Sequence, residues 1–234
     1  MSAKTQASSV AAWAVHLLTA SGAVAGLFAM IAVTQDRAER AALLMLLALA
    51  IDGVDGTFAR AARVRERVPG IDGRRLDDVV DYLNYVIVPA FFLWRLGRVD
   101  DPAWLAAPVL ASAFGFARVD AKTEDDFFLG FPSYWNVLAI YLWLFETPPW
   151  LANGLLVGLA LAVFIPFKYL YPSKLEPPRL RRALALAGML WGLALVVCAG
   201  WPEWARARHL PALSLLYPAW YFALSFQRGG LRRA

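Results

Sequence analysis

The chain has 234 residues, of which 60% are hydrophobic and 18% are charged, and its formal net charge is +5. This composition is too apolar for an ordinary soluble domain, and the apolar residues stand in long runs instead of narrow amphipathic stripes. A protein embedded in lipid is therefore indicated. The positive charge requires no nucleic acid partner, because basic rims are usual where a membrane protein meets an anionic leaflet.

The apolar runs predict an all-α integral membrane protein, a bundle of about eight transmembrane helices. A bilayer core requires about 20 apolar residues per helix, and eight runs are close to that length. They are residues 10–33, 40–60, 77–97, 102–118, 133–147, 149–170, 181–201 and 209–227. Because the connections between them are short, we expect one membrane-embedded domain over residues 1–234.

Lysine and arginine are distributed unequally between the alternating connections. Of the 23 basic residues, 17 fall on the side that also holds both termini, and six fall on the other side. Cytoplasmic loops carry the excess of Lys and Arg in membrane proteins. We therefore expect both termini, and the basic connection 61–76, to be cytoplasmic.

Acidic and small residues gather where two neighbouring apolar runs approach this basic connection. In the helix expected over 40–60, one face collects Asp52, Asp55, Gly56, Ala59 and Arg60. In the helix expected over 73–97, the four-residue spacing collects Gly73, Asp77 and Asp81. Two antiparallel helices would bring the four aspartates into one pocket. Carboxylates at membrane depth require pairing or a cation, and oxygen ligands suit magnesium or manganese.

This pattern resembles the signature of the CDP-alcohol phosphotransferases, D-x2-D-G-x2-A-R-x8-G-x3-D-x3-D, and matches it at its eight defined positions. One departure is the spacing, since twelve residues separate Arg60 from Gly73 instead of eight. The longer gap is similar to the bacterial phosphatidylcholine synthases, an outlying branch of that family. Residues 78–89, 130–136 and 166–168 resemble the same branch.

The resemblance implies a transferase in which the hydroxyl of an alcohol, choline in this branch, attacks the lipid-linked phosphate of CDP-diacylglycerol and releases CMP. It implies two divalent ions, manganese or magnesium, held by Asp52, Asp55, Asp77 and Asp81. Asp81 corresponds to the family's proposed general base, and metal ligation and proton transfer are both open to it. A homodimer in a bacterial inner (cytoplasmic) membrane, with the active site facing the cytoplasm, is implied as well.

The remaining motif residues are expected to bind CDP-diacylglycerol. Gly56 and Ala59 leave room for a flat nucleotide on the helix face, and Arg60 is placed to pair with a phosphate oxygen. Gly73 is expected to relieve crowding where its helix starts. The alternative for Gly56 and Ala59 is that they are small residues at a helix–helix interface.

Aromatic residues near the motif are candidates for choline, because quaternary ammonium groups bind against aromatic faces. Tyr85 is the first candidate, since it follows Asp81 by four residues. The others are Tyr82, which adjoins Asp81, and Tyr134 and Trp135, which begin a helix expected on the same membrane face. The alternative is an aromatic belt at the membrane interface.

Two other functions compete with the transfer to choline. A sister enzyme would use serine, inositol phosphate or glycerol phosphate, although a phosphorylated acceptor calls for a further cluster of buried cations. A divalent-cation transporter would also place carboxylates in the membrane. Arg60 beside the aspartates disfavours the transporter, because its charge would repel a permeating cation.

Overall fold

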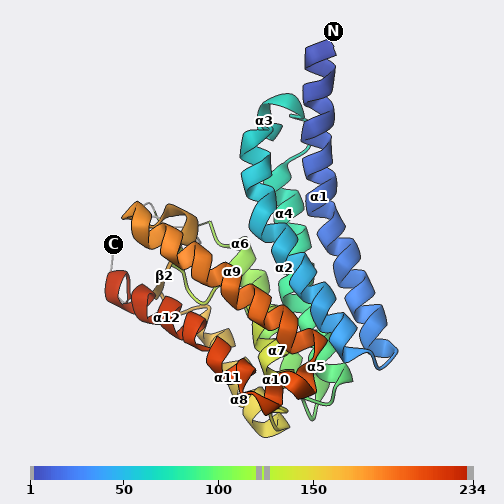
Figure 1. Ribbon diagram of the computed structural model, residues 1–234, viewed down its shortest axis with the longest axis vertical. Helices are drawn as coiled ribbons and strands as arrows, with labels where there is room; N and C mark the ends of the chain where they lie inside the picture. Colours follow the sequence, from blue (N-terminus) through green and yellow to red (C-terminus); the bar gives the residue numbers. More distant parts are fainter. Residues whose placement is uncertain (1–2, 120–122, 124–126, 231–234) are drawn as a thin grey trace.

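The computed structural model describes residues 3–119, 123 and 127–230, and this part of the chain is mostly helical (Figure 1). It begins with a long hairpin of α1 (Ala3–Thr34) and α2 (Ala38–Ala61), which pack side by side. The turn between them has Asp36 at φ 57°, in the left-handed region that aspartate tolerates better than most residues. The N-terminal end of α1 extends beyond its neighbours at the top of Figure 1.

The second motif helix is one continuous rod from Gly73 to Arg95. After the short α3 (Val64–Arg67), it runs through α4 (Gly73–Tyr82), the π-helical turn η1 (Leu83–Ile87) and α5 (Val88–Arg95). In η1 the Val88 N–H donates to the Leu83 carbonyl, five residues earlier. Pro89 explains this wider turn, because proline has no N–H for the carbonyl four residues before it and its ring crowds that carbonyl.

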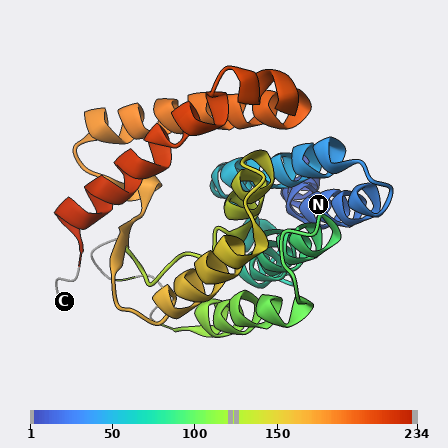
Figure 2. The same cartoon turned by 90° about the horizontal axis from the view of Figure 1, so that it is seen from below.

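The middle of the chain adds η2 (Pro102–Leu105), α6 (Ala106–Ala117), α7 (Trp135–Leu144) and α8 (Pro149–Ala162). Two short antiparallel strands, β1 (Phe127–Leu129) and β2 (Lys168–Leu170), pair with Phe128 opposite Tyr169. The remaining elements are η3 (Pro172–Lys174), α9 (Pro178–Gly200), α10 (Pro202–Ala207), α11 (Leu210–Ser214) and α12 (Leu216–Arg228). Figure 2 shows α9 and α12 side by side along one flank of the other helices.

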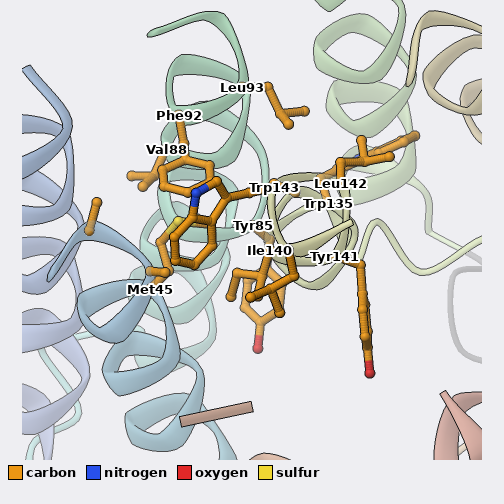
Figure 3. Packing of buried hydrophobic residues seen from close by; sticks show 14 of the residues in the cluster. Met45, Tyr85, Val88, Phe92, Leu93, Trp135, Ile140, Tyr141, Leu142 and Trp143 are labelled. Carbon is orange, nitrogen blue, oxygen red and sulfur yellow. The ribbon is translucent and has the colours of Figure 1, made fainter. Parts of the chain in front are cut away.

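The main hydrophobic core lies where α2, α5 and α7 meet. Phe92 and Trp143 contact each other edge to face, with ring centroids 6.0 Å apart, and Met45 and Val88 pack beside them (Figure 3). Tyr85 lies at the margin of this cluster, with its hydroxyl pointing away from the apolar side chains. The core thus holds the second motif helix against α2 just beyond the aspartates.

The structure supports the helical membrane fold but not the count of eight spans. In the described part of the chain, three helices are long and apolar enough to cross a membrane: Ser9–Thr34, Ala38–Ala61 and Pro178–Gly200. Three shorter apolar helices are Pro102–Ala117, Trp135–Leu144 and Pro149–Ala162. The motif helices, expected over 40–60 and 73–97, are found at Ala38–Ala61 and, as one rod, from Gly73 to Arg95. The predicted domain 1–234 extends beyond the described residues at both ends.

Two expected helices are interrupted, and proline accounts for both differences. The prediction of a helix over 149–170 is wrong after Ala162, because Pro166 cannot continue a helix and residues 168–170 pair as β2. The helix expected over 209–227 breaks between α11 and α12. Pro218 has no N–H to donate to the Ser214 carbonyl, so the helical hydrogen bonding lapses there.

The connections alternate between two sides of the bundle. The connections that follow α1, α5, α7 and α9 lie toward the lower side of Figure 1, whereas the connections that lead into α4 and α9 lie higher. The basic connection between α2 and α4 is therefore on the opposite side from the connections that carry fewer basic residues.

Candidate functional site

Three of the four motif aspartates meet between α2 and α4. One carboxylate oxygen from each of Asp52, Asp55 and Asp77 lies within 4.8 Å of the other two. Asp55 is buried, with 6% of its surface exposed, while Asp52 and Asp77 are half-buried. Asp81 lies outside this group of three but lines the same pocket. The two helices therefore face each other, as the spacing of the motif predicted.

The pocket has a third wall, which α1 provides. Thr19 and Gly22 of α1 line it together with the aspartates, and Asn84 and Tyr85 of η1 line its deeper end. Asn84 is buried, and its Oδ1 has no hydrogen-bond partner among the described residues. This oxygen lies close against Gly26 of α1, so Asn84 marks the tight contact between η1 and α1 at the deeper end of the pocket.

Two hydroxyl groups donate hydrogen bonds to the clustered carboxylates. The Thr19 hydroxyl donates to Oδ2 of Asp55 at 2.6 Å, and the Tyr85 hydroxyl donates to Oδ2 of Asp52 at 2.6 Å. Such short distances are typical of a hydroxyl that donates to an ionised carboxylate. The two aspartates therefore have fixed partners from different helices.

The start of α4 is defined by local sequence. Asp72 is the N-cap, and its side chain accepts from the backbone N–H groups of Arg74 and Arg75 at 3.1 and 3.3 Å. The next residue is Gly73, where a Cβ atom would lie 3.3 Å from Cε1 of His16 on α1. Gly73 thus lets α4 begin close against α1, which agrees with the expectation that it relieves crowding.

The small and basic residues of α2 differ in their surroundings. A Cβ atom at Gly56 would meet only Nη1 of Arg60, at 3.5 Å, so no other helix packs on this glycine in the described part of the chain. Ala59 instead packs against the cluster formed by α1 and α3. Arg60 is exposed, and among the described residues its guanidinium donates to Thr57 at 3.1 Å and pairs with no carboxylate. The space over Gly56 and Arg60 is therefore open.

The four aromatic candidates separate into two groups. The rings of Tyr85 and Tyr134 lie near each other, with centroids 6.3 Å apart, beside Asp52. Tyr82 turns toward α6, where its hydroxyl donates to the Val109 carbonyl at 3.0 Å. Trp135 is buried, and its indole N–H donates to the Ser112 hydroxyl at 2.7 Å. The structure thus brings only the first two to the aspartates.

Thr19, Gly22 and Asn84 are site residues that the spacing of the motif does not reveal. For Thr19 and Gly22 the signal lies in α1, where they share one helical face with Gly26. A Cβ atom at Gly22 would lie 3.0 Å from Val80, and one at Gly26 would lie 2.3 Å from Oδ1 of Asn84. A small-xxx-small pattern of this kind indicates a close helix contact. Only the fold shows that the contact borders the aspartates.

The donor set fits a divalent cation. Carboxylate oxygens are hard ligands, and magnesium and manganese are bound by one or two carboxylates together with water and substrate phosphates. The cluster of Asp52, Asp55 and Asp77 supplies such oxygens within one ion's reach. A cation would also offset the repulsion between three neighbouring negative charges.

Comparisons with known proteins agree with the motif. The family model described as CDP-alcohol phosphatidyltransferase matches residues 13–166, which include all the motif positions. A phosphatidylcholine synthase of Legionella pneumophila is 40% identical over 93% of this chain and 88% of its own length. Proteins of the same name from Borreliella burgdorferi and Pseudomonas aeruginosa are each 38% identical, over 73% and 70% of this chain and 74% and 71% of their own. With a family match over more than half of its length and relatives of this similarity, the chain belongs to the CDP-alcohol phosphatidyltransferase family.

Proposed function

We propose that this protein transfers the phosphatidyl group of CDP-diacylglycerol to choline and releases CMP. The observation that carries the proposal is the cluster of Asp52, Asp55 and Asp77, with Asp81 beside it, on the complete family motif. The relatives that cover most of the chain are named phosphatidylcholine synthases, which favours choline as the acceptor.

Asp52, Asp55 and Asp77 would hold the divalent metal, magnesium or manganese, with Asp81 completing a site for two ions. When bound, the metal neutralises charge on the diphosphate of the substrate. The aspartates belong to two helices that the core packs rigidly against each other. The site is thereby built on rigid elements, which phosphoryl transfer requires because it depends mainly on positioning.

Gly56, Ala59, Arg60 and Gly73 would bind CDP-diacylglycerol. The open space over Gly56 leaves room for the cytidine, and Arg60 projects from the same helix one turn later. Because its guanidinium pairs with no carboxylate among the described residues, it is available for a phosphate oxygen.

Asp81 would act as the general base. In the proposed step, the choline oxygen forms a bond to the lipid-linked phosphorus, and the bond from this phosphorus to the CMP oxygen breaks. CMP leaves with that electron pair, and the hydroxyl proton passes to the Asp81 carboxylate. Asp81 lies beside the three-carboxylate cluster but outside it, so of the four aspartates it is the one whose oxygens are least committed to ligation and most available to accept the proton.

Tyr85 and Tyr134 would bind the choline ammonium. Their neighbouring rings lie beside Asp52, and a quaternary ammonium bound against aromatic faces gains about 0.5–2 kcal/mol from each ring. Tyr82 and Trp135 hydrogen-bond to α6, which favours Tyr85 and Tyr134 over them as the residues that contact choline.

The protein would work as one membrane domain in a bacterial inner membrane, with the pocket facing the cytoplasm. The excess of Lys and Arg on the side of the α2–α4 connection supports this orientation. The homodimer stays a prediction from the family resemblance.

The test is CMP release by the purified protein from CDP-diacylglycerol, assayed in parallel with choline, serine, inositol phosphate and glycerol phosphate, with and without manganese. Of these acceptors, we expect only choline to support CMP release, and only when a divalent metal is present. Release with serine but not choline would reassign the acceptor. No release with any alcohol, combined with manganese flux into proteoliposomes, would favour the transporter.

A further inference from the structure

We propose that Thr19 and Tyr85 are positioning residues, whose hydroxyl groups hold Asp55 and Asp52 in the orientation that binds the divalent metal. The inference deepens the proposed function and rests on its metal site. It assigns α1, which carries none of the motif residues, a direct part in forming that site.

The two hydroxyls reach the aspartates from two different elements that line the same pocket. Thr19 comes from α1 and Tyr85 from η1, and each donates to one carboxylate oxygen at 2.6 Å. The carboxylates are three residues apart on a single helix, so without outside partners each could rotate independently about its own side-chain torsions. Donors on two other elements restrict that rotation.

The environment makes these hydrogen bonds difficult to replace with water. Thr19, Asp55 and Tyr85 are 8%, 6% and 6% exposed. Asp55 is buried, so the loss of its Thr19 donor would leave a buried oxygen unsatisfied, whereas Asp52 is half-buried and depends on a donor that is itself buried. The bonds should therefore persist in the folded protein, both before and after a cation binds.

The Thr19 hydroxyl lies much nearer to Asp55 than to the carbonyl that its own helix offers. A threonine hydroxyl in a helix commonly donates to the carbonyl four residues earlier, and the Thr19 hydroxyl does lie 3.4 Å from the Val15 carbonyl. Its single proton is directed instead to Asp55, at 2.6 Å. Tyr85 lies in the π-helical turn that Pro89 imposes, and such turns occur frequently at functional sites.

Groups that hydrogen-bond to metal ligands set the affinity of a site, and their loss weakens binding by about 10–100-fold. Thr19→Val keeps the shape of the side chain and removes only the hydroxyl. Tyr85→Phe likewise keeps the ring next to Tyr134. We expect each variant to bind manganese at least about tenfold more weakly, whereas Thr19→Ser, which retains the hydroxyl, should bind like the parent.

Matched controls separate this role from a general loss of hydrogen bonding. Thr34→Val removes a threonine hydroxyl elsewhere on α1, where it donates to the Ile31 carbonyl. Tyr141→Phe removes a buried tyrosine hydroxyl that interacts with Ser214 at 2.8 Å and accepts from Trp191 at 2.9 Å, outside the pocket. Both controls should keep the parent's manganese affinity, even if Tyr141→Phe melts at a lower temperature.

The measurement is the melting temperature of each purified protein in detergent during a manganese titration, relative to the same protein in EDTA. Differences in fold stability cancel in this comparison, and no substrate is needed. The inference would be overturned if Thr19→Val and Tyr85→Phe both bound manganese like the parent. The role of Thr19 would be overturned if Thr19→Ser lost as much manganese affinity as Thr19→Val. A parent protein that manganese does not stabilise would instead overturn the metal site, and the positioning roles with it. The two substituted residues lie on different elements, so if one variant fails to fold, the manganese affinity of the other still tests the inference.

Discussion

Asp81 has surroundings distinct from those of the other motif aspartates, because it lines the pocket without joining the cluster of three. We predict that Asp81→Asn lowers CMP release by about 10²–10⁴-fold, since asparagine keeps the size of the side chain but cannot accept the hydroxyl proton. Manganese should still raise the melting temperature of this variant. Turnover within a few-fold of the parent would remove Asp81 from the role of general base.

Gly56 lies on the face of α2 that the nucleotide would cover, and among the described residues no neighbouring helix fills the space above it. We predict that Gly56→Leu abolishes binding of CDP-diacylglycerol by occupying this space. Gly154 in α8 is a matched control, because a Cβ atom there meets nothing within 4 Å and the residue does not line the pocket. Gly154→Leu should bind like the parent in a direct binding assay, and equal damage at both positions would exclude the cytidine site.

Tyr134 offers a test of choline binding that leaves the Tyr85–Asp52 hydrogen bond in place. We predict that Tyr134→Ala raises the choline KM about tenfold, which corresponds to about 1.4 kcal/mol, because one aromatic face is lost. Tyr134→Phe should have a much smaller effect, since the ring remains. The KM for CDP-diacylglycerol is the internal control, and a choline KM unchanged in Tyr134→Ala would place the ammonium elsewhere.

At the scale of elements, the approach of α1 to η1 depends on Gly26. A Cβ atom there would lie 2.3 Å from Oδ1 of Asn84 and 3.1 Å from Val88, so the two helices cannot keep their separation if the side chain grows. We predict that Gly26→Ala destabilises the protein by about 1–3 kcal/mol, as overpacking usually does. It should also weaken manganese binding, because Asn84 borders the aspartates.

The control for this prediction is Gly158→Ala in α8, where a Cβ atom meets nothing within 4 Å. Melting temperatures in detergent, with and without manganese, measure both effects. A Gly26→Ala variant as stable as Gly158→Ala would mean that Asn84 and Val88 move aside without consequence for the fold.

At the scale of the whole molecule, the proposed orientation can be tested by chemical labelling. Cys198 is the only cysteine and is buried in α9, so Cys198→Ala supplies a background without reactive thiols. In that background we predict that Arg65→Cys reacts with a membrane-impermeant maleimide only in inverted vesicles. Gln35→Cys should react only in intact spheroplasts, because its connection lies on the less basic side. Both positions are exposed, and the reverse pattern would invert the topology.

Sequence alone was sufficient for the properties that depend on local patterns. Apolar runs and helical periodicity predicted a helical membrane protein, and the spacing of the motif placed Asp52, Asp55 and Asp77 on facing helices. These predictions succeed because residues three and four apart must share a face of a helix, whatever the rest of the chain does. The family resemblance rested on the same spacing, and the comparisons confirmed it.

The tertiary structure decided what depends on distant residues. Thr19 and Tyr85 meet carboxylates 36 and 33 positions away, and no local pattern encodes which helices become neighbours. Tyr82 and Trp135 turn to α6 because partners for their polar atoms lie there. Sequence had favoured the aspartates, since Tyr82 adjoins Asp81 and Trp135 begins a helix expected on the same membrane face. The pairing of β1 with β2 likewise required two segments some 40 residues apart to meet, since an isolated strand cannot satisfy its own backbone hydrogen bonds.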